Sequence, residues 1–109
     1  MRTINRTAIT IITKKPYIDW INNFEGTTGN EDPIATTILI PDEYDEIDYE
    51  VYLEKTFKTI FEDQLESWTT NCNEWPSKRT YKIFKEWFDV YCSDIIWDFG
   101  DDEIKHDED

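Results

Sequence analysis

The sequence predicts an α+β domain built as a two-layer sandwich, in which helices cover one face of a three-stranded mixed sheet. Three observations support this prediction: short β-branched runs typical of strands, apolar stripes at helical spacing between them, and an aromatic content of 16%. The elements follow in the order β-α-β-α-α-β. A chain of 109 residues is long enough for one domain with its own core, which we expect over residues 1–99. We expect the acidic residues 100–109 to form a frayed tail.

The first strand and the first helix are predicted near the N-terminus. Residues 5–13 (NRTAITIIT) are rich in β-branched side chains, and their apolar residues fall on both faces, which favours a central strand. Pro16 suits the first turn of a helix. The apolar stripe of this helix consists of Tyr17, Trp20, Ile21 and Phe24. Residues 25–33 contain two glycines and a proline, so they predict a loop in which Gly26 ends the helix.

The second strand is predicted over residues 34–40 (IATTILI), which Pro41 closes. Two strands that flank a helix form a βαβ unit, in which the strands are parallel and the crossover is right-handed. The residues between the two strands are numerous enough for such a crossover. We therefore expect the first two strands to be parallel neighbours.

The second half of the chain predicts two helices and a last strand. Residues 49–68 keep an apolar stripe over five turns, and Thr80 is placed to cap a third helix. The stripe of that third helix consists of Phe84, Trp87, Phe88 and Tyr91. Residues 93–99 (SDIIWDF) alternate as a third strand would.

The formal net charge of −14 is unevenly distributed. Residues 1–24 carry four basic and one acidic side chain, whereas residues 25–109 carry seven basic and 24 acidic ones. Such a field repels nucleic acids and anionic membranes and attracts basic proteins. We therefore expect a basic protein as partner, and neither direct nucleic-acid binding nor membrane binding.

The densest group of acidic residues lies at 42–50, directly after the second predicted strand. Helix electrostatics accounts for Asp48 as an N-cap candidate and for Glu50 in the first turn. It does not account for the four acidic residues before them, because the helix dipole acts only within about one turn. Two interpretations remain: a solvated loop, or a recognition surface with tyrosines as contacts. The candidate contact residues are Asp42, Glu43, Tyr44, Asp45, Glu46 and Tyr49.

A second candidate region is the aromatic and basic segment 75–91 (WPSKRTYKIFKEWFDVY). Its helical stripe is typical of core packing, and its cations are placed to neutralise nearby acidic side chains. Arg79 lies close in sequence to Trp75, which suggests a stacked ion pair. Trp20 and Trp75 are the aromatic residues most expected at a surface pocket, and Arg6 is a further candidate for lining it.

No catalytic or metal-binding motif is found in the sequence. The single histidine, His106, lies in the predicted tail, and the phosphate-binding, dinucleotide-binding and zinc-protease motifs are absent. The acidic segment lacks the glycine and the final glutamate of an EF-hand loop. Cys72 and Cys92 permit one disulfide, but in a reducing cytoplasm they are expected to be small buried thiols. We expect no metal and no cofactor, and the lack of catalytic motifs disfavours an enzyme.

Several short motifs resemble a group of small acidic bacterial proteins that have no assigned function. The residues that carry this resemblance are Asn5-Arg6, Lys15-Pro16-Tyr17, Trp20-Ile21-Asn22, Trp75-Pro76, Arg79-Thr80, Phe84 and Trp87-Phe88-Asp89. They extend over most of the chain, from residue 5 to about 97. The resemblance implies a bacterial cytoplasmic protein and supplies no catalytic residues.

The sequence therefore predicts a cytoplasmic, non-enzymatic interaction module that binds or inhibits a basic protein. One alternative is a small-ligand-binding domain or minor enzyme, with a pocket between sheet and helices lined by Arg6, Trp75 and Arg79. Another is a nucleic-acid mimic, whose carboxylates would replace phosphates. No apolar run is long enough to span a membrane, and the oligomeric state stays open.

Overall fold

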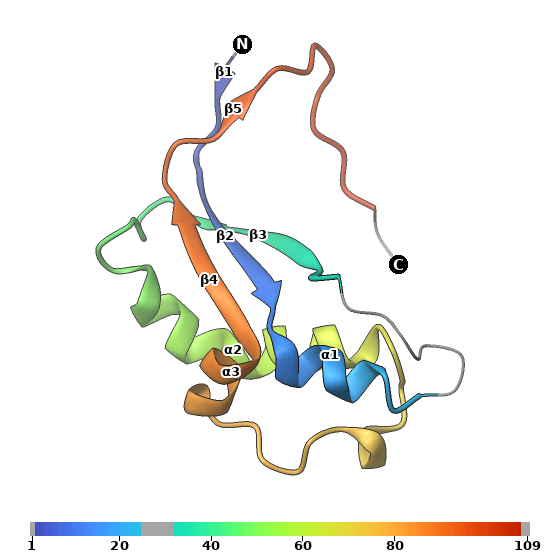
Figure 1. The fold of residues 1–109 in the computed structure, drawn as a ribbon. Coiled ribbons are helices and arrows are strands. Elements are labelled where there is room, and N and C mark those ends of the chain that lie inside the picture. The colour runs from blue at the N-terminus through green and yellow to red at the C-terminus, as the bar shows by residue number, and fades with distance from the viewer. Residues whose placement is uncertain (1, 25–31, 108–109) are drawn as a thin grey trace.

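The computed structural model describes residues 2–24 and 32–107, and Figure 1 shows the fold. The chain is α+β, with three α-helices, one 3-10 turn and two small antiparallel sheets in this part. The strands are β1 (Arg2–Thr3), β2 (Arg6–Thr13), β3 (Ala35–Pro41), β4 (Phe88–Ser93) and β5 (Trp97–Asp98). The helices are α1 (Lys15–Ile21), α2 (Tyr49–Glu66), the 3-10 turn η1 (Cys72–Glu74) and α3 (Tyr81–Trp87). The predicted stop at Gly26 lies outside the described residues.

The main sheet has the order β3-β2-β4, so the first long strand is central, as predicted. The prediction of a mixed sheet with parallel first strands was wrong, because β2 pairs antiparallel with β3, from Arg6 opposite Pro41 to Ile12 opposite Ala35. The seven residues of α1 rise only about 10 Å, whereas the eight residues of β2 span about 27 Å. The helix itself does not carry the chain back along the sheet, and β3 starts beside the end of β2, with Ala35 opposite Ile12.

The third strand of the main sheet is β4, not the predicted segment 93–99. The third helix ends at Trp87, and the chain continues directly as β4, which pairs antiparallel with β2. Phe84 of α3 and Phe88 of β4 are both buried and lie four residues apart. In the sequence, this spacing resembles the apolar stripe of one continuous helix. Pairing with the central strand overrides that local pattern. Within 93–99, only Trp97–Asp98 forms a strand, and it pairs with β1 in a separate ribbon.

The core joins the inward side of the sheet to all three helices. Ile9 and Ile11 of β2 point into it, whereas Thr10 and Ile12 alternate to the other face and are only half-buried. The helical and β4 contributions include Tyr17, Ile21, Leu53, Phe61, Leu65, Phe84 and Phe88. In Figure 1 the helices group at one end of the molecule, while β1 and β5 extend from the other.

The two residues predicted to cap helices, Thr80 and Asp48, differ in whether their side chains make the capping hydrogen bond. Thr80 caps α3 as predicted, because its side chain accepts a hydrogen bond from the Ile83 N–H at 3.2 Å. Asp48 occupies the N-cap position of α2, but its side chain makes no capping bond. Cys72 and Cys92 are free thiols, but the prediction that both are buried was wrong, because Cys72 is exposed and Cys92 is half-buried. No helix in residues 2–24 and 32–107 is long and apolar enough to cross a membrane.

Candidate functional site

The acidic segment, residues 42–50, folds into a turn that two of its own aspartates hold. The Asp45 carboxylate accepts hydrogen bonds from the Ile47 N–H at 2.8 Å and from the Asp48 N–H at 3.3 Å. The Asp48 carboxylate accepts one from the Asp45 N–H at 2.7 Å. These reciprocal bonds resemble a capping box placed one turn before the helix. Asp45 and Asp48 therefore have a structural role.

The ionised form of Asp45 is favoured by these bonds. The hydrogen bond from the Ile47 N–H contributes most to lowering the pKa of Asp45 below its usual value, and the Asp48 N–H adds to it. Because the charged carboxylate is the better acceptor, the turn is most stable when Asp45 is ionised. The conformation of the segment is thus coupled to pH in the acidic range.

The tyrosines of the segment attach it to the domain. The hydroxyl of Thr7 on β2 donates a hydrogen bond to the Tyr44 carbonyl, and the Tyr44 ring lies 5.0 Å from the Tyr52 ring. Burial raises the pKa of Tyr49, and its N–H donates to the Asp45 carbonyl at 2.9 Å. Both tyrosines are half-buried. They anchor the turn, so they contribute less to a free surface than the sequence suggested.

Three carboxylates of the segment remain unpaired within the described part of the chain. Glu50 pairs with Lys85 on α3 at 2.8 Å, which removes it from the available charges. The side chains of Asp42, Glu43 and Glu46 are exposed and make no hydrogen bond or ion pair with a described residue. Between them and α2 lies Ile47, an apolar side chain that is 91% exposed. The turn thus presents three free negative charges beside one apolar group.

The residues proposed for a pocket divide between two ends of the molecule. Arg79 donates to the Glu62 carboxylate at 3.1 Å and to the Pro76 carbonyl at 2.7 Å, and its guanidinium lies 5.6 Å from the Trp75 ring. Trp20 donates to the Glu74 carbonyl at 2.9 Å, which brings it to the same end. Arg6 lies at the opposite end of β2, opposite Pro41. Trp75 and Arg79 pack against each other, and Arg6 is remote from both.

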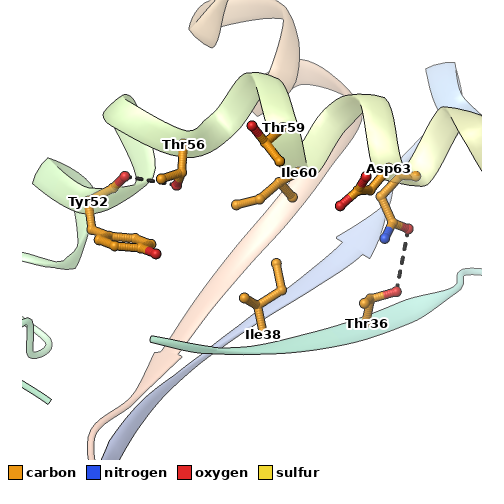
Figure 2. A pocket seen from close by; sticks show the side chains of 8 residues that line it. Thr36, Ile38, Tyr52, Thr56, Thr59, Ile60 and Asp63 are labelled. Carbon is orange, nitrogen blue, oxygen red and sulfur yellow. Dashed lines mark hydrogen bonds between the residues drawn. The ribbon is translucent and has the colours of Figure 1, made fainter. Parts of the chain in front are cut away.

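A cavity of about 350 Å³ lies instead between β3 and α2. Figure 2 shows side chains of the two elements pointing toward one another across it. The apolar floor is formed by Ile38 and Ile60, and Thr36 donates a hydrogen bond to the Gln64 side chain at 3.4 Å at one end. The remaining lining residues are Tyr52, Thr56, Thr59 and Asp63. None of Arg6, Trp20, Trp75 and Arg79 lines this cavity, whereas Arg79 lines a separate pocket of about 420 Å³ beside Tyr81 and Arg6 lines one of about 160 Å³ beside Leu39.

The described residues contain no arrangement suited to metal binding or nucleophilic catalysis by cysteine. No group of three or more His, Cys, Asp or Glu side chains among them is placed to hold a metal ion. Burial raises the pKa of the Cys92 thiol, and the nearby carboxylates of Asp94 and Glu46 raise it further. A thiol whose pKa is raised is a weak nucleophile near neutral pH.

Two features of the site have signals in the sequence that were not used. Ile47 is an apolar residue within the acidic turn before α2, where a solvated loop would be expected to carry polar side chains. Thr56, Thr59 and Asp63 form a second, polar stripe on α2, which faces β3 in the structure. Their neighbours Thr36 and Ile38 come from a distant segment, so only the fold brings the two groups together.

No protein-family model, no curated protein and no solved structure matches this chain. The functional interpretation therefore depends on the geometry of the acidic segment and of the cavity.

Proposed function

We propose that this protein is a non-enzymatic interaction module that binds, and in binding blocks, a basic partner protein through the acidic segment. The observation that supports this best is the combination of three unpaired carboxylates, Asp42, Glu43 and Glu46, with the exposed Ile47 on a turn held by Asp45 and Asp48. Unpaired charges steer a basic partner, and an apolar side chain fixed among them provides a contact that excludes water.

Further apolar surface supports a contact at the same end of the molecule. The ribbon of β1 and β5 starts beyond Arg6, and Arg6 pairs with Pro41 immediately before the acidic segment. Trp97 of β5 is exposed, as is Ile95 in the segment between β4 and β5. Exposed apolar groups of this kind match the composition of protein interfaces.

The proposal takes the domain as a two-layer sandwich of the order β-α-β-α-α-β, followed by the tail. It also places the protein in the cytoplasm, where Cys72 and Cys92 stay reduced. The tail and the oligomeric state play no part in the proposed contact.

Small-ligand binding is a second candidate, supported by the cavity between β3 and α2. Its volume of about 350 Å³ lies at the lower end of the range for ligand pockets. Nucleic-acid mimicry has less support, because the three unpaired carboxylates gather in one turn and do not follow a rigid face.

The proposal is tested by capture of partners from a lysate of the source organism with charge-matched variants. The first variant combines Asp42→Asn, Glu43→Gln and Glu46→Gln, and its control combines Asp101→Asn, Asp102→Asn and Glu103→Gln in the tail. Both remove three negative charges, so bulk attraction falls equally. The proposal requires a partner that the first variant loses and the control retains, with binding that weakens as salt rises.

Equal loss with both variants would show that only net charge matters, and equal retention would exclude the acidic segment. The variant Ile47→Ser tests the apolar contact separately. It should weaken capture without changing the dependence on salt.

A further inference from the structure

Strand β3 forms an open edge of the main sheet. It pairs with β2 on one side, and no other described strand pairs with it. The pairing with β2 runs without interruption from Ala35 to Pro41, so the strand contains no bulge. A straight edge of this kind leaves a row of backbone donors and acceptors for another strand.

The register identifies the backbone groups that point outward. The Thr13 N–H donates to the Ile34 carbonyl at 3.0 Å, which marks that pair as hydrogen-bonded. Because hydrogen-bonded pairs alternate in an antiparallel ladder, Thr36, Ile38 and Ile40 direct their backbone groups toward β2. The N–H and carbonyl groups of Thr37 and Leu39 therefore face the free edge.

The sequence of this edge strand lacks the features that prevent strand addition, and the C-terminal segment approaches the strand at Leu39, where Ile104 and His106 line the same small pocket. Natural edge strands are blocked by charged side chains, by proline within the strand or by bulges. The sequence of β3, ATTILIP, has no charge, and its proline stands at the last position. The other edge strand, β4, carries Asp89. The sheet is thus protected less at β3 than at β4.

The cavity between β3 and α2 lies beside this edge. Ile38 and Thr36 line it from the helix-facing side of β3, and Ile60, Thr59 and Asp63 line it from α2 (Figure 2). A strand added to β3 would continue the sheet, so alternate side chains would point toward α2. One apolar side chain would then contact Ile38 and Ile60, and a neighbouring cation would lie near Asp63.

We infer that β3 accepts an extended, basic segment of the partner by strand addition, with an apolar side chain of that segment in the cavity between β3 and α2. Main-chain hydrogen bonds then supply affinity, and the cavity supplies specificity. The inference rests on the proposed function for the sign of the partner's charge, and it adds the mode of binding.

The charges around β3 favour a basic partner over a second copy of this chain. Asp42 and Glu43 follow the last residue of β3, Asp32 precedes the strand, and Asp63 lines the cavity. In a symmetric antiparallel pair of β3 strands, the acidic residues after one strand would meet Asp32 of the other copy. Two chains of charge −14 would repel one another there, whereas a basic segment is attracted along the whole edge.

The inference is tested with a displayed library of random peptides as long as β3, seven residues, selected on the full chain. We expect basic peptides with alternating apolar residues to be enriched. Leu39→Pro removes the outward N–H, and an edge strand tolerates this change because that N–H makes no bond to β2. Leu39→Ala is the matched control, because it shortens the same side chain and keeps the N–H.

Selected peptides should lose about tenfold or more in affinity for Leu39→Pro and stay within a few-fold for Leu39→Ala. If Leu39→Pro does not fold, N-methylation of alternate peptide amides should cause the same loss with the wild-type chain. Thr59→Trp, which fills the cavity, should also exclude the peptides, and Lys58→Trp, at an exposed position of α2 that does not line the cavity, should not.

Three results would overturn the inference: no enriched peptides, equal affinity for the proline and alanine variants together with no effect of N-methylation, or a dimer of the chain that Leu39→Pro abolishes. Peptides or partners that are insensitive to Leu39→Pro but lost with the variant at 42, 43 and 46 would leave the proposed function standing. Such peptides or partners would exclude only the inference of strand addition. Binding that survives both Leu39→Pro and the variant at 42, 43 and 46 would count against both the proposed function and strand addition.

Discussion

Removal of the hydroxyl group is expected to change the stability of the protein in different ways at two tyrosines, Tyr17 and Tyr81. The Tyr17 side chain is 1% exposed, and its hydroxyl donates to the Gln64 carbonyl at 2.6 Å. Burial raises the pKa of Tyr17 to about 12, so this hydroxyl is a donor throughout the neutral range. The Tyr81 hydroxyl is also buried, but it has no hydrogen-bond partner among the described residues. Tyr17→Phe and Tyr81→Phe remove the same atom from these two environments.

The expected magnitudes follow from what each hydroxyl leaves behind. The Gln64 carbonyl also accepts a bond from the Ser67 hydroxyl at 2.7 Å, so Tyr17→Phe does not leave it unpaired. The free energy of unfolding should therefore fall by about 1 kcal/mol, the net value of one hydrogen bond. Tyr81→Phe removes a polar group whose burial costs about 1–3 kcal/mol without a partner, so the free energy of unfolding should stay constant or rise. The contact of Lys85 with the ring, at 5.6 Å, survives this change.

The assay is urea unfolding monitored by tryptophan fluorescence, in which Trp20, 5.5 Å from Tyr17 between ring centroids, is a close reporter. A change in the midpoint at constant slope reports stability alone. In thermal unfolding, the loss for Tyr17→Phe corresponds to about 4 °C in the midpoint for a domain of this size. If Tyr81→Phe destabilises the protein as much as Tyr17→Phe, the described hydrogen bonding of the core is wrong.

Two further predictions concern the helix cap and the acidic turn. Thr80→Ala should lower the free energy of unfolding by about 1 kcal/mol, because it removes the bond to the Ile83 N–H, whereas Thr70→Ala at an exposed position should change it little; urea unfolding of both variants measures this. The pKa of Asp45 is lowered in the folded state, so its stabilising effect is present above the unfolded value of 3.8 and is lost as the pH falls through the folded value. The protection factor of the Ile47 amide, which corrects the exchange rate for its intrinsic dependence on pH, should therefore fall below pH 3.8, and Asp45→Ala should show a low protection factor at every pH. Unchanged exchange at Ile47 in that variant would contradict the reciprocal turn.

The sequence predicted those elements whose local pattern agrees with their tertiary environment. β2 was predicted as the central strand because its apolar residues fall on both faces, and its pairing with β3 and β4 explains that pattern. Thr80 was predicted as a cap because its position and its chemistry agree. A local pattern of alternation or helical spacing is sufficient to predict a strand or a helix when the fold requires the same spacing.

The predictions failed where long-range pairing decides the structure. The spacing of Phe84 and Phe88 fits a helix, but the hydrogen bonds available along β2 make the second of them the first residue of a strand. The direction of β3 depends on where the chain re-enters the sheet, which is beside the end of β2, and the connection is long enough for either direction. Such outcomes require knowledge of the neighbours of a segment, which its local pattern does not contain.

The acidic segment stays a predicted contact, and the structure shows which of its charges and tyrosines are used in the fold. The acidic segment is an exposed turn, but Asp45, Asp48 and Glu50 are used in the fold, and the half-buried tyrosines attach the turn to the domain. The cavity between β3 and α2 joins residues that are far apart in the chain, and no local pattern groups them. Sequence composition therefore predicts the sign of a surface, whereas the fold determines which charges are free.

The contact proposed for the acidic segment is tested most directly by hydrogen–deuterium exchange of the full chain, alone and with the partner it captures. Peptides that contain residues 42–47 should be protected by the partner, and protection should decrease with rising salt. Protection confined to α3 or to residues 100–107, with unchanged exchange over 42–47, would contradict the proposal that the acidic segment is the contact.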